Sequence, residues 1–406
     1  MSVPGTRSGS MVFSAEEESA FNTKNGGFAP LKIAGWDHNP GLKRAVIENP
    51  SAKAFLAGNE PAAGLSWTES EIALTTYVQG LGGSGAGDQT AATLNCFSHM
   101  LGASLGGAPV TSTGSTATGT PSATSVTEAD DGNHTANSIV PFTGASGAVY
   151  MRPVGTYLSG AMALLMELPS GDLPTTGSVI MGAVNVAMDE DISHTIQGDL
   201  IGRNAHQSFE YFGAVGNFSL NEAQAGEAQT IGWTFRPASY THRPSTSQAA
   251  PLPSRPTVAA GGEFKIAKFG NSTVKDLSVL NVSIELGRQY EGDPDPNADD
   301  GLCNWIVIDQ ATRITVHVKD ADTPPTGFTS QTYRECWGTG DTENDFHLLF
   351  VFGRKTAGKL FALYVRRCHL VMEPELVDMN GISVQRLVFE PSQKLSAEDG
   401  IWSAQG

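Results

Sequence analysis

Residues 209–239 read FEYFGAVGNFSLNEAQAGEAQTIGWTFRPAS, and residues 361–392 read FALYVRRCHLVMEPELVDMNGISVQRLVFEPS. Each stretch begins with an aromatic strand, reaches an acidic residue, turns at a glycine and closes on Phe-x-Pro. The corresponding positions are Phe209 and Phe361, Glu222 and Glu373, Gly226 and Gly381, and Phe235 and Phe389. Internal repeats of this kind indicate the architecture of a chain. The two stretches predict two β-hairpins of one shape and, with them, an internally duplicated pair of β domains.

Further strand signals surround these hairpins. The segment LSWTESEIALTTYVQG, which starts at Leu65, alternates apolar and polar residues around Ile72 and Leu74, as a strand with one buried face does. Beyond residue 262, segments such as FKIAKF, LSVLNVSIELG, NWIVID and FHLLFVFG recur at short spacing. The 46 glycines and the low charged fraction of 17% suit short strands joined by turns. The chain is therefore expected to be mainly β.

One helix is predicted, from Asp88 to Leu101. Asp88 is placed to act as its N-cap, Leu94, Phe97 and Leu101 share one face, and Gly102 follows the last apolar position. The expected helix is short and amphipathic.

Composition divides the 406 residues into five predicted segments. Residues 106–137 are rich in glycine, serine and threonine, and so few apolar anchors leave too little burial to offset chain entropy, which predicts a long loop. Five prolines mark residues 243–262 as a semi-rigid linker. The segments are an extended N-terminal arm (1–30), a first β lobe that contains the loop (31–242), the Pro-rich linker (243–262), a second β lobe (263–395) and a C-terminal tail (396–406).

Charge and cysteine usage narrow the class of protein. The formal charge of -17, from 42 acidic and 25 basic residues, argues against a protein that binds phosphates through clustered lysine and arginine. Such acidity is expected of a surface that weakly repels DNA and lets it pass. It is equally expected of a protein whose charge only aids solubility. The four cysteines lie far apart and predict free thiols rather than a zinc site or disulfide framework. Without a signal peptide or an 18-residue apolar run, the protein is expected to be made in a cytoplasm and to have no membrane partner.

The segment Gly80-Leu-Gly82-Gly-Ser-Gly85 matches the spacing of a dinucleotide-binding loop between a strand and a helix. Its surroundings do not fit that function. The preceding strand alternates instead of running apolar, as a buried parallel strand would. No acidic residue follows at the distance where one would bind a ribose hydroxyl. A flexible turn is the preferred interpretation.

The segment from Asp293 to Gly301 carries oxygen ligands at alternate positions, as a calcium loop does. Ala298 stands where that pattern needs Gly for a sharp turn, and Asn304 stands where it needs a bidentate Glu. A solvated acidic hairpin tip is favoured, and calcium binding stays open. Signatures of nucleophiles and zinc hydrolases are absent. We therefore predict no catalytic, cofactor-binding or metal-binding residues, no cofactor and no enzymatic activity.

Four segments resemble the major tail tube proteins of long-tailed bacteriophages. The first is GNFSLNEAQAGEAQTIGWTFRPAS, which carries an acidic turn and Ala-Gly-Glu before its returning strand. The second and third are LSVLNVSIELGRQYEG and NWIVIDQATRITVHVKD. The last, LVMEPELVDMNGISVQRLVFEPS, is similar to the final hairpin of that family, in which an Asp-x-x-Gly turn leads into the last strand. The likeness covers much of residues 205–395.

This resemblance implies packed β-sheets with a flanking helix and a structural protein of the virion. Subunits of the family close into rings whose sheets join into a β-barrel around a channel, and the rings stack into a tube through which viral DNA leaves without specific binding. Implied partners are copies of the chain, in rings of three or six, and other tail proteins at the tube ends, assembled in the host cytoplasm. The alternative is a capsid decoration protein or a tail adhesin, a β-sandwich that binds a capsid or a host surface.

Overall fold

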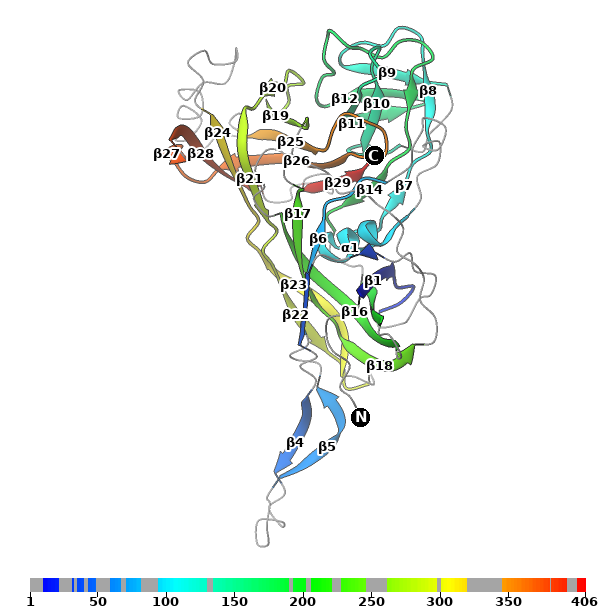
Figure 1. Cartoon of the computed structure of the whole chain (residues 1–406), viewed down its shortest axis with the longest axis vertical. Helices are drawn as coiled ribbons and strands as arrows, with labels where there is room; N and C mark the ends of the chain where they lie inside the picture. The colour runs from blue at the N-terminus through cyan, green and yellow to red at the C-terminus, as the bar shows by residue number, and fades with distance from the viewer. Residues whose placement is uncertain are drawn as a thin grey trace.

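The chain is described from a computed structural model, and its fold is mainly β with one short helix, as predicted. The structure describes residues 10–21, 31–32, 35–39, 43–48, 59–66, 71–81, 94–129, 134–189, 193–201, 206–220, 228–245, 261–297, 301–319, 345–379, 381–392 and 400–406. In these ranges no helix is long and apolar enough to span a membrane. A small barrel lies at one end of the elongated molecule, and a two-stranded hairpin projects at the other (Figure 1).

One run of paired strands contains eight members, each antiparallel to its neighbours. In spatial order they are β3 (Gly35–Asn39), β6 (Glu71–Tyr77), β17 (Thr230–Arg236), β16 (His206–Leu220), β21 (Val279–Glu285), β24 (Arg313–Lys319), β28 (Ile382–Pro391) and β27 (Glu375–Met379). Four strands of the first predicted lobe are therefore followed by four strands of the second, with no break in the sheet.

Two further groups of strands continue from this run. The end of β28 pairs with β26, which leads into the order β7 (Val110–Thr111), β14 (Val184–Ala187), β29 (Ile401–Gln405), β26 (Phe361–Leu370), β25 (Phe346–Phe352), β19 (Glu263–Lys268) and β20 (Lys275–Asp276). The first half of β16 lies in the order β2 (Leu31–Lys32), β1 (Ser10–Glu17), β15 (His194–Ile201), β16 and β18 (Ser239–Ser245).

The single helix of the described chain, α1 (Cys96–Leu105), begins and ends later than predicted. Asn95 caps it: its side chain accepts a hydrogen bond from the Ser98 amide at 2.9 Å, and the Ser98 hydroxyl accepts one from the Asn95 amide at 3.0 Å. Asp88, the predicted cap, lies outside the described residues. The predicted stop, Gly102, is inside the helix, where a Cβ would lie 2.8 Å from the His194 ring. The close packing at Gly102, with Gly106 as the actual C-cap, explains the error.

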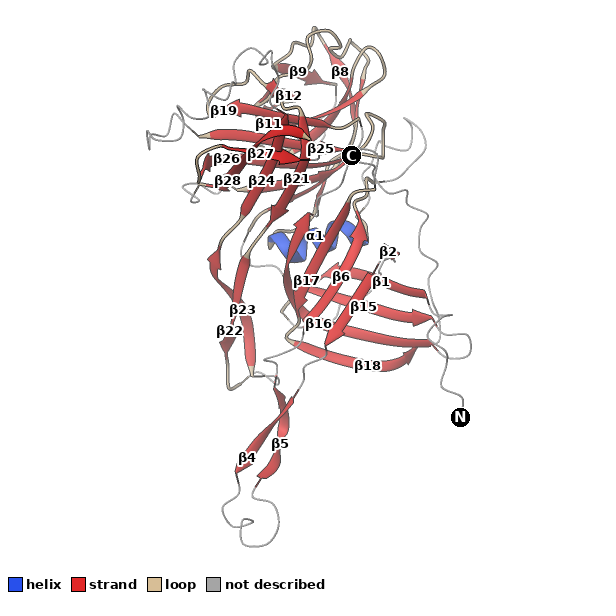
Figure 2. Ribbon diagram, turned by 60° about the vertical axis from the view of Figure 1, so that its left-hand side comes forward, coloured by secondary structure: helices blue, strands red, loops and turns tan. Residues whose placement is uncertain are grey.

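The helix does not flank the sheets but lies between them, as Figure 2 shows. Nearly all its residues are buried in one large core. Phe97 contacts the rings of Trp233 and Phe361 edge-on, with centroids 5.5 and 5.6 Å away. Trp233 belongs to the first predicted lobe and Phe361 to the second, so the two lobes meet in a common core around the helix.

His99 makes the stability of this core pH-dependent. Its ring lies 5.8 Å from the His194 ring, and burial lowers the pKa of His99 to about 4. A histidine whose pKa falls on folding resists protonation, so the free energy of unfolding should fall as the pH drops from 6.5 towards 4, by roughly 3 kcal/mol. In the variant His99→Gln, denaturant unfolding across this pH range should show a shallower slope. An unchanged slope would contradict the assignment.

Residues 106–137 are not a long loop, contrary to the prediction. They contribute β7 and two strands of a small closed barrel, whose members are β8 (Ser115–Thr118), β9 (Ser125–Glu128), β10 (Ile139–Thr143), β11 (Val149–Leu158), β12 (Ala161–Leu164) and β13 (Val179–Ile180). The first two strands contribute only Ala117 and Val126 to the hydrophobic core of the barrel, and the later strands supply its bulk, including Phe142 and Met162. A polar segment folds here because its apolar partners lie elsewhere in the chain.

Both predicted terminal segments contain strands of the main fold. Within the predicted arm, β1 pairs along its length with β15, and residues 1–9 and 22–30 lie outside the described chain. Within the predicted tail, β29 lies between β14 and β26, where Ala404 is fully buried. Most of the predicted linker, residues 246–260, is also outside the described chain.

Candidate assembly surface

The eight-strand run contains the same four-strand pattern twice. In the first pattern, β3 and β6 pair with each other, and between them in sequence lies the hairpin of β4 (Lys43–Glu48) and β5 (Asn59–Ser66). In the second, β21 and β24 pair, and between them lies the hairpin of β22 (Arg288–Pro294) and β23 (Leu302–Gln310). Next in the sheet comes β17 beside β6, and β28 beside β24. We call β3, β6, β17 and the end of β16 the first unit, and β21, β24, β28 and β27 the second unit.

Strand registers agree between the units. Phe235 of β17 lies opposite Ile72, which lies opposite His38. Phe389 of β28 lies opposite Ile314, which lies opposite Ile284. The equivalence of Phe235 and Phe389 is the one the sequence repeat predicted, and the pairing extends it to two more strands of each unit.

One face of each unit packs on the common core. In the first unit this face carries Ile72, Leu74, Ile231, Trp233 and Phe235, and in the second Val282, Ile284, Ile314, Val316, Leu387 and Phe389. Trp233 also donates a hydrogen bond from Nε1 to the Thr76 hydroxyl at 2.9 Å, so its polar atom is satisfied inside the core. The alternation predicted from Ile72 and Leu74 is confirmed by burial along β6.

The opposite face is polar and carries charges of both signs. Its described side chains include Glu71, Thr75, Thr234, Arg236, Ser219, Glu285, Arg313, His317, Glu375, Arg386 and Glu390. Arg313 lies 3.6 Å from Glu390, and Arg386 lies 3.5 Å from Glu375. Arg313, Arg386 and Glu375 line a groove of about 550 Å³. These pairs are exposed, so each contributes little to stability. The net negative charge of the chain is therefore not concentrated on this face.

The two units join edge to edge within the chain. Ser219 of β16 lies opposite Glu285 of β21, and Leu220 lies opposite Ile284. The Asn217 amide group extends the junction: its Nδ2 donates to the Arg288 carbonyl at 2.6 Å, and its Oδ1 accepts from the Arg288 amide at 2.7 Å. This junction leaves two outer edges, β3 of the first unit and β27 of the second, with which no other strand of the described chain pairs.

The two hairpins project from the same end of the sheet (Figures 1 and 2). The β22–β23 hairpin packs on the first unit through Trp305, whose Nε1 donates to the Gly213 carbonyl at 2.8 Å, and through Tyr290, whose hydroxyl donates to the Gly216 carbonyl at 2.8 Å. Burial raises the pKa of Tyr290. The other side of the hairpin exposes Ile306 and Ile308.

Replacing Trp305 by phenylalanine tests this anchoring. The change removes one buried hydrogen bond and leaves the Gly213 carbonyl unpaired, so the free energy of unfolding should fall by about 1 to 2 kcal/mol. Hydrogen exchange of the β22–β23 amides should rise more than exchange in β25 or β26. Ile308→Ala, which changes an exposed side of the same hairpin, serves as the control. Equal exchange in the two variants would contradict the anchoring role.

The glycine-rich segment at residue 80 has a packing role. A Cβ on Gly80 would lie 2.7 Å from the Gly358 carbonyl oxygen, so only glycine fits there. The preceding strand, β6, is antiparallel to both neighbours, whereas a dinucleotide site needs a parallel strand that leads directly into a helix. Residues 82–93 lie outside the described chain, and α1 begins only at Cys96.

The acidic segment from Asp293 to Gly301 lies at the turn between β22 and β23. Asp295 accepts hydrogen bonds from the amide and side chain of Asn297, and Asp293 accepts one from the Cys303 thiol at 3.1 Å. That bond to Asp293 raises the pKa of Cys303. Residues 298–300 lie outside the described chain, and in the rest of it no three acidic, histidine or cysteine side chains gather as a metal site. Calcium binding at this turn stays an open prediction.

Cys96, Cys303 and Cys368 are free thiols, in agreement with the prediction, and Cys336 is outside the described chain. Burial raises the pKa of Cys96 to about 12, so this thiol is unreactive at neutral pH.

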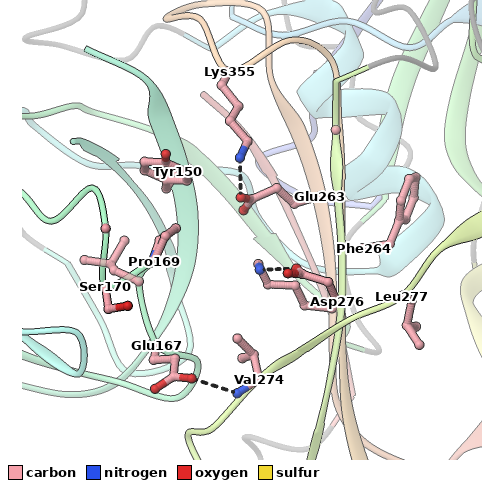
Figure 3. Close-up of a pocket in the computed structure, with 14 residues that line it drawn as sticks. Tyr150, Glu167, Pro169, Ser170, Glu263, Phe264, Val274, Asp276, Leu277 and Lys355 are labelled. Carbon is pink, nitrogen blue, oxygen red and sulfur yellow. Dashed lines mark hydrogen bonds and ion pairs between the residues drawn. The ribbon is translucent and has the colours of Figure 1, made fainter. Parts of the chain in front are cut away.

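A charged seam between the small barrel and β19 was not predicted (Figure 3). Arg152 of β11 is fully buried and donates from Nη1 to Glu263 at 2.7 Å, while the Lys355 ammonium lies 2.8 Å from the other Glu263 oxygen. Burial alone would raise the pKa of Glu263, but these two cations outweigh it and hold the pKa below its usual value. Beside the seam is an open groove of about 630 Å³. The seam fixes the barrel to the sheet.

A scan of protein-family models found no match to the chain, and a search of curated protein sequences found none either. The repeated units and their edges are therefore the features of the chain that bear on its function. The sequence indicated the repeat through its two hairpins, but it did not indicate which strands would form the outer edges. The only sequence signal for an edge was the apolar Leu376 and Val377 in a short strand that also carries acidic residues.

Proposed function

We propose that this chain is the major tail tube subunit of a long-tailed bacteriophage. Copies join through the outer strands of the eight-strand sheet into a ring, and rings stack into the conduit for viral DNA. The observation that carries the proposal is the pair of equivalent units, already joined edge to edge in one chain, with one open edge at each end. The resemblance of the two repeated hairpins to the tail tube family supports it.

Closure into a ring follows from the two different outer edges. An exposed strand edge invites pairing with another chain, and a closed barrel removes every edge. Because β3 and β27 are different strands, the contact between copies is head-to-tail, and such a contact closes into a ring when the rotation permits. With two units in each chain, three copies supply the six units of a family ring. The apolar face then packs away from the channel, on the core around α1.

The polar face lines the channel in this arrangement. Its acidic and basic side chains are interspersed and partly paired, as with Arg313 and Glu390. A surface without clustered cations does not retain a polyanion, because binding DNA requires net neutralisation of its phosphates. DNA would pass along this face without specific binding. Other tail proteins would cap the ends of the tube in the virion.

Electron microscopy of the purified protein tests the proposal. We expect hollow tubes or stacked rings whose formation depends on protein concentration. Isolated particles at every concentration, together with binding to a capsid or to host cells, would instead support a decoration protein or an adhesin.

A further inference from the structure

We propose that β27 of one copy pairs antiparallel with β3 of the next, with Glu375 opposite Asn39 and Leu376 opposite His38. This inference rests on the proposed function and names the partner strands and their register. The template is the junction inside the chain, where the end of β16 in the first unit pairs with β21 of the second.

The register follows from the equivalence of the units. Phe235 and Phe389 are equivalent, so Ile231 of β17 corresponds to Gln385 of β28. Ile231 lies opposite Leu220, and Gln385 lies opposite Leu376, so Leu376 corresponds to Leu220.

The strand that receives the contact is assigned in the same way. Ile284 of β21 and His38 of β3 occupy the same position, since they lie opposite Ile314 and Ile72. Inside the chain Leu220 pairs with Ile284. Between chains, Leu376 therefore pairs with His38, and the preceding residue Glu375 pairs with Asn39 as Ser219 pairs with Glu285.

Burial distinguishes the two equivalent leucines. Leu220 is 1% exposed beside its partner strand, whereas Leu376 is 62% exposed at the outer edge. Leu376 occupies the position of a core residue, but no strand of the described residues covers it. β3 and β27 are at opposite ends of the eight-strand run, so the covering strand comes from another copy.

The same symmetry places the β4–β5 hairpin. The β22–β23 hairpin packs on Val215 and Ala238 of the first unit. Val215 lies opposite Arg236, and its counterpart His369 lies opposite Glu390. The β4–β5 hairpin of the copy that supplies β3 should therefore lie on the surface around His369 of the copy that supplies β27.

Cysteine crosslinking tests the register. In a background with Cys303→Ser and Cys336→Ser, chains carrying Asn39→Cys are mixed with chains carrying Glu375→Cys, assembled and oxidised. We expect disulfide-linked dimers, and from the double variant Asn39→Cys/Glu375→Cys a covalent species of three chains. The control pairs Glu375→Cys with Asp37→Cys, which is displaced by two residues on the same strand and should crosslink at least tenfold less.

A second variant tests the apolar contact without depending on disulfide geometry. Leu376→Asp should fold normally, because the side chain is exposed in the single chain, and should raise the concentration needed for assembly at least tenfold. The matched control Leu158→Asp changes a leucine that is 77% exposed on the small barrel and should assemble like the wild type.

The outcomes separate the two proposals. Tubes that do not crosslink between positions 39 and 375, or a Leu376→Asp variant that assembles like the wild type, would overturn this pairing and leave the tube function standing. A wild-type chain that stays monomeric at every concentration would overturn both.

Discussion

Replacing Arg152 by methionine is expected to lower the free energy of unfolding by about 3 to 5 kcal/mol at pH 7, because it removes one partner of a buried ion pair. The guanidinium is fully buried, and besides Glu263 it donates to the carbonyls of Met151 and Glu167 at 2.7 and 2.9 Å. Without the Arg152 guanidinium, the negative charge of the buried Glu263 carboxylate is only partly neutralised. Chemical denaturation monitored by circular dichroism measures the difference.

The pH dependence of this loss identifies its cause. The pKa of Glu263 is depressed on folding, so its contribution is present above the ordinary value of 4.5 and disappears as the pH falls below it. The difference between wild type and Arg152→Met should therefore narrow as the pH falls from 4.5 through the lowered pKa of Glu263, where the carboxylate of the folded protein becomes protonated. The control Lys355→Met removes the more exposed cation from the same carboxylate and should cost at most about 1 kcal/mol. A loss that is independent of pH would instead assign the effect to packing.

Truncating Phe97 to alanine should be nearly as costly, at about 3 to 5 kcal/mol. Phe97 is 1% exposed and lies between Trp233 and Phe361, so its removal leaves a cavity between the two halves of the chain. Phe97→Leu, which keeps most of the volume, should cost about 1 kcal/mol. Thermal unfolding of the two variants measures the contrast.

The destabilised Phe97→Ala variant also bears on the unity of the core. One cooperative transition at a lower temperature is expected, because both units pack on the same helix. Two separate transitions would contradict a common core and would indicate lobes that fold independently.

Local patterns predicted the strands well where one face is buried. The alternation around Ile72 and Leu74 and the repeated hairpins ending in Phe235 and Phe389 corresponded to real strands. In a strand with one buried face, apolar residues lie on that face and polar residues on the other, so the sequence alternates. The order of the strands was not predictable in the same way. Pairing of β14 with β29, or of β16 with β21, joins distant parts of the chain, and no local pattern records such a contact.

Segments with few apolar residues were the main source of error. The strand Ser115–Thr118 folds because the small barrel takes most of its core from later strands, so its own composition says little about its order. The helix was misplaced because of a glycine. Gly102 resembles a stop signal in the sequence, but it is the residue that lets the helix approach His194.

The candidate surface was only partly visible in the sequence. The repeat indicated two related units, and the resemblance indicated a ring. The short strand around Leu376 was only a weak signal of an exposed edge, because in the sequence a leucine destined for an interface is identical to one destined for the core. The buried Arg152 was equally hidden, because the residue that satisfies its charge is more than a hundred positions away.

The rotational symmetry of the assembled tube, determined by cryo-electron microscopy, tests the central claim most directly. If each chain contributes two equivalent but non-identical units to the ring, the tube has threefold symmetry, and the outlines of six similar units appear around the channel. A ring of six complete chains with strict sixfold symmetry, or a closed ring in which β3 and β27 do not meet, would contradict the account.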